Sequence, residues 1–383
     1  MKSNMRWMVA LSVMVGAYLN GATNSLAATT AEETAEATVM MGSYEAQQKA
    51  AAAAREKDAA WKPACDEIGS IQVGDAKKPG SLRNFCLNTD GNILACFAAG
   101  ETASGKATSG KAVSGLRVYS PKGELLKTLP LEIKPSAVCV TKGGTIFVAG
   151  DGRVLKLDQE GKVLAAVDSP VAKEPVVIGK EVEEMLKQSG RTAKDEIPKM
   201  KAQLERRRAD VTGLAVTGED VFMACPAPND FTYRVYRFDH SLENAKLVVE
   251  KLRGCCGQMD IQAHEGKLWI PHNARHQVEC CDRDGKQLTK FGKSGKVKAS
   301  DFGGCCEPKN VRILPNGEIL AAESGPPTCI KRFSADGKFL GVVAVVKGKG
   351  DCVRVTVEAS ADGKSYYMLD TAHDAIRVFG TKS

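Results

Sequence analysis

Aromatic side chains are scarce in this chain of 383 residues, in which Phe, Trp and Tyr together make up 5% of the total. Basic and acidic residues are interleaved along the whole sequence, and the formal net charge is +7. A nucleic-acid groove needs clustered positive charge and flat rings on which bases stack. The sequence shows neither, so no nucleic-acid partner is expected and the charge is interpreted as a solvated surface.

Long apolar runs are also missing. The run from Trp7 to Leu19 is shorter than the roughly 18 residues of a membrane span. It follows Lys2 and Arg6 and precedes the small residues around Ala27, which have the character of a cleavage site. Residues 1–27 are therefore predicted to be a signal peptide. The mature chain is expected to be periplasmic or secreted, with no transmembrane segment.

Two short catalytic motifs are absent as well. No two cysteines have the C-x-x-C spacing of thioredoxin-like centres and usual zinc sites, and no serine lies in a G-x-S-x-G nucleophile elbow. These absences favour a binding protein over an enzyme. No cofactor is indicated either.

What the sequence does contain is a repeat of short apolar runs separated by tight glycine turns. The gaps between the aligned turn glycines are 53, 74, 48, 51 and 46 residues. These glycines are Gly91, Gly144, Gly218, Gly266, Gly317 and Gly363. Periods of roughly 40 to 50 residues, with about four strands in each, are typical of propeller blades. We therefore predict an all-β fold, a six-bladed β-propeller.

The two ends of the chain are expected to meet in one blade. The last repeat ends near Phe379, after its third strand, and the run from Ile68 to Val73 can supply the fourth. This pairing would hide the edge of the sheet, and residues 68–383 are assigned to the propeller. Residues 28–67 are rich in Ala and Glu and are predicted to form a tail or an exposed helix.

The longest gap between repeats contains an insertion at about residues 171–210. Val182, Met185 and Leu186 have helical spacing, and Pro198 is placed at the start of a second helix. We predict a helical hairpin that could serve as a lid. A second insertion, from Gly100 to Gly115, is rich in Gly, Ser, Ala and Lys and is expected to be a loop.

The third strands of the repeats resemble a known family. The segment from Asp370 to Phe379, DTAHDAIRVF, is similar to the NHL-repeat consensus, in which a polar loop leads into Ile-x-Val-Phe. The segment from His272 to Cys281 follows it more loosely, and Ile330 to Phe333 supplies its end in the fifth repeat. The resemblance covers about residues 68–380 and implies a propeller. It does not define the function, because NHL-type propellers include enzymes, binding platforms and scaffolds.

Six-bladed lactonases of similar architecture hold Ca²⁺ with Glu, Asn and Asp side chains from several blades. The equivalent positions in the first two repeats of this chain are Phe97-Ala98-Ala99 and Ala149-Gly150, which offer no carboxylate. An enzyme of that kind is therefore not expected.

Three pairs of adjacent cysteines are the most unusual feature of the sequence. They are Cys255-Cys256, Cys280-Cys281 and Cys305-Cys306, spaced by 25 residues, in a chain with thirteen cysteines. Neighbouring Cα atoms lie about 3.8 Å apart, whereas disulfides favour about 4.4–6.8 Å, so a bond between neighbours makes a strained, rigid ring. Such a ring restrains the unfolded chain very little. A specialised surface is the better explanation.

Alignment of the repeats places the first and third doublets in crossings from an outer to an inner strand, on the face of the helical insertion. We predict that the oxidised doublets form the wall of a funnel at the channel mouth, which binds a small, largely apolar or sugar-like ligand. His272 and His276 are expected to add polar contacts. Cys280-Cys281 aligns with a third strand, where adjacent side chains point to opposite faces, and is grouped with the others as part of one surface.

Other interpretations of the cysteines stay open. With His272 and His276 they could hold a soft metal ion such as copper or zinc. Strained disulfides are readily reduced, which would suit a redox enzyme, and a hydrolytic enzyme is a further alternative. The doublets could also be structural thiols, or could pair with distant cysteines. No protein partner is indicated.

Overall fold

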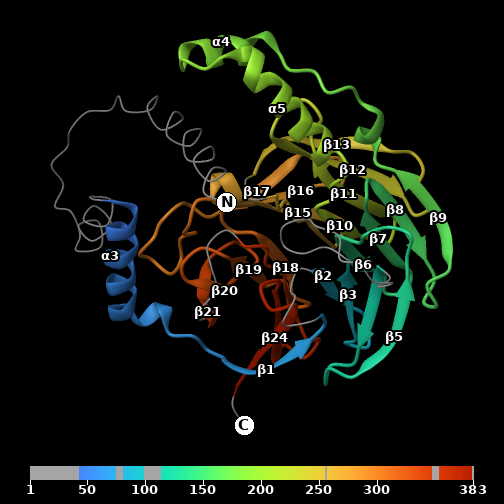
Figure 1. The fold of residues 1–383 in the computed structure, drawn as a ribbon. Helices are drawn as coiled ribbons and strands as arrows, with labels where there is room; N and C mark the ends of the chain where they lie inside the picture. Colours follow the sequence, from blue (N-terminus) through green and yellow to red (C-terminus); the bar gives the residue numbers. More distant parts are fainter. Residues whose placement is uncertain (1–42, 75–80, 99–113, 255–256, 347–352, 382–383) are drawn as a thin grey trace.

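The computed structural model describes residues 43–74, 81–98, 114–254, 257–346 and 353–381. Six four-stranded antiparallel sheets are arranged around a central axis, as Figure 1 shows. The predicted six-bladed propeller is thereby confirmed. The predicted signal peptide, most of the loop that begins at Gly100, and the doublet Cys255-Cys256 lie outside the described residues.

Each blade runs from an inner to an outer strand in chain order, with the exception of the sixth. The first blade comprises β2 (Leu82–Leu87), β3 (Ile93–Phe97), β4 (Gly115–Tyr119) and β5 (Leu125–Pro130). The second comprises β6 (Ala137–Val140), β7 (Ile146–Gly150), β8 (Arg153–Leu157) and β9 (Val163–Asp168). The third comprises β10 (Gly213–Val216), β11 (Asp220–Pro226), β12 (Thr232–Asp239) and β13 (Lys246–Arg253).

The second half of the ring repeats the arrangement. The fourth blade comprises β14 (Gln262–His264), β15 (Lys267–His272), β16 (Gln277–Cys281) and β17 (Gln287–Phe291). The fifth comprises β18 (Asn310–Ile313), β19 (Ile319–Glu323), β20 (Thr328–Phe333) and β21 (Phe339–Val346). The sixth comprises β22 (Val357–Ala359), β23 (Ser365–Asp370), β24 (Ala375–Gly380) and β1 (Asp66–Gln72).

The sixth blade joins the two ends of the chain. Strand β1 pairs antiparallel with β24, with Ile71 opposite Ile376, as the sequence predicted. Ile71 and Val73 are buried in a cluster with Leu82 and Phe85 of the first blade. The closing strand therefore completes one sheet and also contributes to the hydrophobic contact between the first and last blades.

Hydrophobic clusters between neighbouring blades hold the ring together. In each cluster, residues of one sheet pack against residues of the next, as Leu94 and Leu116 of the first blade do with Val148 and Leu155 of the second. The second strands β3, β7, β11 and β19 are wholly buried because both of their faces meet a neighbouring blade. Their sequences are accordingly continuous apolar runs rather than alternating ones.

The tight turns explain the glycine spacing. In the first blade Asn88 accepts hydrogen bonds from the backbone N–H groups of Asp90 and Asn92 through its Oδ1 atom, at 3.0 and 2.8 Å. Gly91 has a φ of 78°, a backbone conformation that side chains with a Cβ rarely adopt. The turn thus requires glycine at this position.

Helices lie outside the ring. The Ala/Glu-rich segment forms α3 (Tyr44–Lys57) and a short 3-10 turn, η1 (Ala59–Trp61). The helix is docked on the loop after β17: Ala51 is buried with Val297, Arg55 donates to the carbonyl of Lys296 at 2.7 Å, and Trp61 Nε1 donates to the carbonyl of Val297 at 2.6 Å. No helix within the described ranges is long and apolar enough to cross a membrane.

The insertion between β9 and β10 contains the predicted hairpin. After η2 (Pro170–Lys173), helices α4 (Lys180–Gln188) and α5 (Ala193–Arg207) pack on each other at the rim, and their buried side chains include Leu186 and Leu204. The start expected for the second helix was wrong: Pro198 lies inside α5, which begins at Ala193.

Candidate functional site at the channel mouth

The inner strands place charged side chains along the axis of the ring. Arg312 of β18 donates to Glu358 Oε1 of β22 at 2.7 Å and to Asp260 Oδ2, which precedes β14, at 3.2 Å. Asn310 Nδ2 also donates to Asp260. Burial alone would lower the pKa of Arg312, but the two carboxylates outweigh it and raise the pKa above its usual value. These groups are satisfied by one another and serve as structural links among blades four, five and six.

Two further links cross the channel. Arg354, just before β22, donates from Nη2 to the carbonyl of Thr212 at 3.0 Å, which joins the sixth blade to the third. Gln258 Nε2 donates to the carbonyl of Val355 at 2.7 Å, and Gln258 Oε1 accepts from the N–H of Val355 at 3.2 Å. All of these residues directly precede inner strands, so they lie at the opening where outer strands cross to inner ones.

Three arginines lie close enough to one carboxylate at this opening to favour its charged form. Arg83 lies at the start of β2, Arg207 is the last residue of α5, and Arg354 lies just before β22. The positive charges of these three residues lower the pKa of Asp210, which lies just before β10. The side chain of Asp210 is exposed, but partial desolvation by the surrounding protein raises the pKa of its carboxyl group. The three arginines lower this pKa and so oppose the rise. Burial likewise lowers the pKa of Arg354.

Some of these guanidinium nitrogens have no acceptor. Arg354 Nε and Arg207 Nη1 are buried and make no hydrogen bond to any described residue. Arg207 also lies 5.4 Å from the ring centre of Phe231 and 5.3 Å from that of Tyr233. The opening therefore combines positive charge and buried donors with the half-buried ring of Phe231. We call the set of Arg83, Arg207, Asp210 and Arg354 the arginine mouth.

Sequence reasoning missed the arginine mouth, although a weak signal exists. Arg83, Asp210, Gln258 and Lys309 each stand eight residues before a turn glycine, and Arg354 stands nine before. In each of these repeats this residue lies at the start of the inner strand or a few residues before it. A comparison of the repeats at this position would have shown polar and charged residues at the start of otherwise apolar strands.

Cys280 and Cys281 do not belong to this opening. Both are thiols on β16, and the two side chains pack in different clusters: Cys281 between blades three and four, Cys280 between blades four and five. Burial raises the pKa of both, that of Cys281 to about 12. The predicted bond between them is wrong, because successive side chains of a strand point to opposite faces.

Cys305 and Cys306 are placed as expected, in the crossing that leads into β18, but they are not bonded to each other. Their Sγ atoms lie 3.3 Å apart. Cys305 is exposed, whereas Cys306 is buried and disulfide-bonded. Lys309 Nζ donates to Cys306 Sγ at 2.7 Å.

The two predicted histidines have different environments. His272 is buried: its Nε2 accepts from the N–H of Arg253 at 2.9 Å and its Nδ1 donates to Glu279 at 2.8 Å, so both ring nitrogens are occupied within the protein. His276 donates from Nε2 to the carbonyl of Gly304 at 3.4 Å and thus lies beside the Cys305-Cys306 loop. Burial lowers its pKa to about 4.

No thiolate metal site is evident in the described part of the chain, where no group of three His, Cys, Asp or Glu side chains is arranged to hold an ion. The doublet Cys255-Cys256 lies outside that part, and the metal hypothesis stays a prediction for it.

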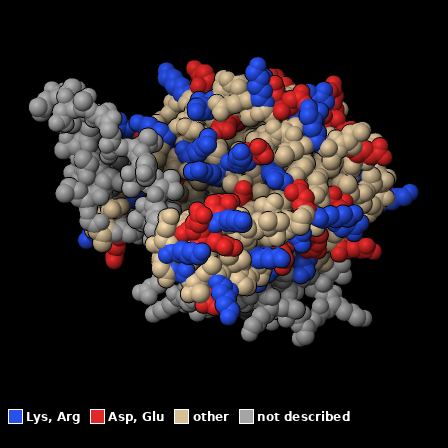
Figure 2. Space-filling view, turned by 90° about the horizontal axis from the view of Figure 1, so that it is seen from above, with Lys and Arg blue, Asp and Glu red and all other residues tan. Residues whose placement is uncertain are grey.

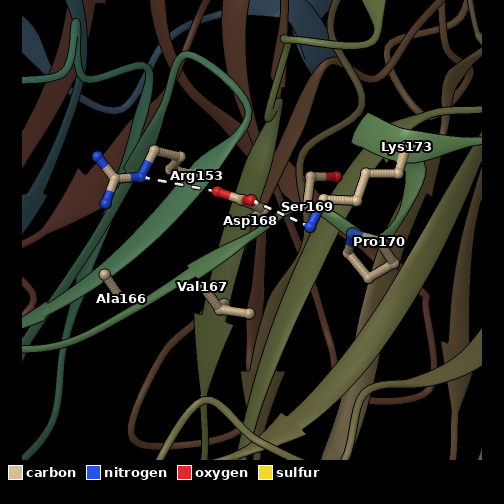
Figure 3. A pocket seen from close by; sticks show the side chains of 7 residues that line it. All are labelled: Arg153, Ala166, Val167, Asp168, Ser169, Pro170 and Lys173. Carbon is tan, nitrogen blue, oxygen red and sulfur yellow. Dashed lines mark ion pairs between the residues drawn. The ribbon is translucent and has the colours of Figure 1, made fainter.

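A groove lies at the rim of the second blade (Figure 3). It measures about 410 Å³ and lies beside Arg153, Asp168, Ser169 and Lys173. Asp168 pairs with Arg153 and Lys173 at 3.8 Å each, and all three side chains are largely exposed. Ion pairs of this kind are weak and screened by salt, and the groove is far from the inner strands, so we do not assign it a function.

Charge is otherwise dispersed. On the face seen in Figure 2, basic and acidic side chains alternate without a continuous stripe of one sign.

Neither a protein-family model nor a curated protein matches the sequence. Solved structures are similar in fold. A chain of the crystal structure of the Mitotic Checkpoint Complex has a TM-score of 0.50 and 9% identity, covering 96% of this chain and 100% of that chain. XC5397, a gluconolactonase from Xanthomonas campestris, has a TM-score of 0.48 and 10% identity over 84% of this chain and 97% of its own. A protein of unknown function from Bacteroides caccae has a TM-score of 0.44 and 13% identity, with 70% and 82% covered.

At these identities the similarity bears on the fold alone. The class of protein defined by the structure is a six-bladed β-propeller. The finer resemblance to NHL repeats stays a prediction.

Proposed function

We propose that this chain is an extracytoplasmic binding protein that holds a small ligand at the arginine mouth, and that the ligand carries a carboxylate or a similar anionic group. The observation that carries the proposal is the pair of buried donors, Arg354 Nε and Arg207 Nη1, which have no acceptor among the described residues. A buried donor without an acceptor costs free energy, and a bound anion would remove that cost.

The shape of the arginine side chain favours such a ligand. A guanidinium group presents its N–H donors in a rigid planar fork that fits the two oxygens of a carboxylate. Arg207 and Arg354 come from an insertion and from the last blade, and each is held by the fold before any ligand arrives: Arg207 over two rings and Arg354 by its bond to Thr212. Preorganisation of this kind lowers the entropy lost on binding.

The ring of Phe231 retains part of the original prediction of an apolar or sugar-like ligand. Phe231, which is half-buried beside Arg207, could contact the uncharged part of the ligand, whereas Tyr233 is fully buried behind it. The helical hairpin then has a positioning role, because α5 ends at Arg207 and brings it to the opening. The extracytoplasmic location rests on the N-terminal sequence, and N-terminal sequencing of the exported protein would test it.

Calorimetric titration at low ionic strength tests the ligand class. D-glucuronate and inorganic phosphate are the charged probes and glucose the uncharged control. We expect saturable binding of at least one charged probe, weakened by salt, and no binding of glucose. Arg354→Met and Arg207→Met should each weaken binding by about tenfold or more, since a hydrogen bond to a charged group contributes roughly 1.5–3 kcal/mol.

Arg153→Met is the matched control, because Arg153 lies at the exposed rim of the second blade. It should leave binding unchanged. Failure of both anions to bind, or equal binding of glucose and glucuronate, would contradict the proposal.

A further inference from the structure

The outer strand of the second blade, β9, has an apolar edge. Its residues 163–167 include no charge and no proline, and Val163 and Leu164 are exposed by 50% and 52%. The strand is bonded to β8 on one side, and no described strand pairs with its other side. The pairing with β8 is irregular only near the first residue of β9 and is regular from Ala165 to Asp168. An edge of this kind presents unpaired N–H and C=O groups to which a further strand can bind.

The other five outer strands are interrupted or covered. Charged residues or proline interrupt four of them: Lys127 and Pro130 in β5, Glu250 and Lys251 in β13, Lys290 in β17, and Asp66 and Glu67 in β1. The fifth, β21, is apolar throughout, and the chain before β1 lies along it. There the N–H groups of Ala64 and Cys65 donate to the carbonyls of Val342 and Val343 at 3.0 and 2.8 Å. Among the described residues, β9 is thus the outer strand whose apolar edge stays uncovered.

The charges at the two ends of β9 make the strand complementary to itself. Lys162 directly precedes the apolar run and Asp168 ends it, and both side chains are exposed. When two copies of β9 run antiparallel about a two-fold axis at Ala165, Lys162 of each copy lies opposite Asp168 of the other. Val163 then lies opposite Val167. The sequence of β9 therefore fits a second β9 in both apolar character and charge.

The charged ends are only weakly engaged within the chain. Asp168 lies 3.8 Å from Arg153 and from Lys173, and these exposed pairs contribute little in water. Glu160, two residues before Lys162 in the preceding turn, is itself paired with Lys127 at 2.9 Å. A second molecule that brings the opposite charge therefore meets little competition.

We propose that two copies of this chain associate through β9, which pairs antiparallel with β9 of the second copy and joins two blades into one continuous sheet. Main-chain hydrogen bonds hold the pair together, Val163 and Leu164 lose part of their exposure, and the two pairs of Lys162 with Asp168 fix the register. Figure 1 shows β9 at the perimeter of the ring, whereas the arginine mouth lies at its axis, so the association leaves both mouths open.

Sedimentation equilibrium tests the association, at protein concentrations from about 5 to about 500 µM because a contact of this size is weak. We expect the wild type to show a monomer–dimer equilibrium. Leu164→Lys places a charge within the apolar run and should weaken the dimer by about tenfold or more. Leu288→Lys is the matched control, because Leu288 is 46% exposed and is the second residue of β17, as Leu164 is of β9. It should leave the dimer unchanged.

Charge reversal tests the register and the partner together. Lys162→Glu places acid opposite acid and Asp168→Lys places base opposite base, so each variant alone should dimerise about tenfold or more weakly than the wild type. A mixture of the two variants should dimerise like the wild type, because the introduced acid of one copy then faces the introduced base of the other. Circular dichroism checks that every variant is folded.

Three results would overturn the proposal. One is a wild type that stays monomeric over the whole concentration range. Another is a dimer that Leu164→Lys and Leu288→Lys weaken equally. The third is a dimer that neither charge reversal weakens, or one that mixing the two reversed variants does not restore. None of these outcomes depends on ligand binding at the arginine mouth.

Discussion

Glu307 is a carboxylic acid whose buried position makes the stability of the protein depend on pH. Its pKa is raised from about 4.5 to about 8, chiefly by burial, and its Oε2 atom has no hydrogen-bond partner in the described structure. The folded state thus binds a proton that the unfolded state releases between these two values. The contribution of Glu307 to the free energy of unfolding is therefore greatest below pH 4.5, and it decreases as the pH rises towards 8.

Glu307→Gln should remove that dependence. The amide oxygen can still accept from Ser324 and Gly325, while the group no longer has to ionise. We expect the variant and the wild type to have similar free energies of unfolding at pH 5, and the variant to be more stable at pH 8 by an amount on the order of 1 kcal/mol or more. Urea unfolding at both pH values measures the difference. An equal gap at the two pH values would show that titration of Glu307 is not the cause.

Arg312 should be far less replaceable than arginines of the outer surface. Arg312→Met leaves the buried carboxylates of Asp260 and Glu358 without their partner, and the loss of one member of a buried pair costs about 3–5 kcal/mol. Arg332→Met, which breaks an exposed pair with Glu318 at 3.8 Å, should cost about 0–1 kcal/mol. Denaturant midpoints of the two variants give the comparison, and similar losses in both would refute the structural role assigned to Arg312.

At the scale of elements, the strands and turns were predictable and the sulfur contacts were not. Five of the six aligned turn glycines have a positive φ, the exception being Gly218, and this conformational requirement is visible in the sequence as a recurring glycine. Cys280 and Cys281 lie on opposite faces of one strand. The alternation of side chains along a strand predicts this arrangement, but the regular spacing of the three doublets led to the wrong prediction that they share one surface. The position of Arg207 and Arg354 near the same carboxylate, Asp210, could not be predicted, because one comes from an inserted helix and the other from the entry to the last blade.

Two truncations should separate the roles of α3 and β1. A chain that starts after η1 loses the contacts of Ala51, Arg55 and Trp61 with the loop beyond β17, and it should remain folded with a lower melting temperature. A chain that starts after Val73 also loses β1, which exposes the edge of β24 and removes Ile71 and Val73 from a core cluster. We expect the second chain to aggregate or to lack a cooperative thermal transition. Equal melting temperatures for the two would argue against closure by β1.

At the scale of the whole molecule, cysteine thiols buried between blades can be used to measure whether neighbouring blades stay packed together. Cys96, Cys139 and Cys225 lie in the clusters between blades, and burial raises the pKa of each; for Cys139 and Cys225 the value is about 12. Cys96 and Cys225 are fully buried, so we expect them to ionise and react only when neighbouring blades separate, whereas Cys139 is half-buried. The six-fold arrangement thus gives the protein a set of internal probes for unfolding.

Alkylation of the native protein at pH 8 should therefore be selective. Among the described cysteines, exposed Cys305 is expected to react with iodoacetamide within minutes, whereas Cys96, Cys225 and Cys281 should react at least about a hundredfold more slowly. Addition of urea through the unfolding transition should abolish the difference. Rapid labelling of the interblade thiols in native buffer would mean that the blades separate readily.

The pairing of β1 with β24 also sets an order of events during synthesis. Because β1 precedes every other strand of the ring and β24 follows them all, the ribosome makes the two halves of this pair furthest apart in time, and the earliest strand has to wait for the last one. Throughout elongation, and throughout export if the chain is exported, the nascent polypeptide carries an open edge and a row of unsatisfied amides that could bind other chains. A cell that makes this protein must shield that edge with a chaperone, or complete the chain quickly enough to outpace misassembly.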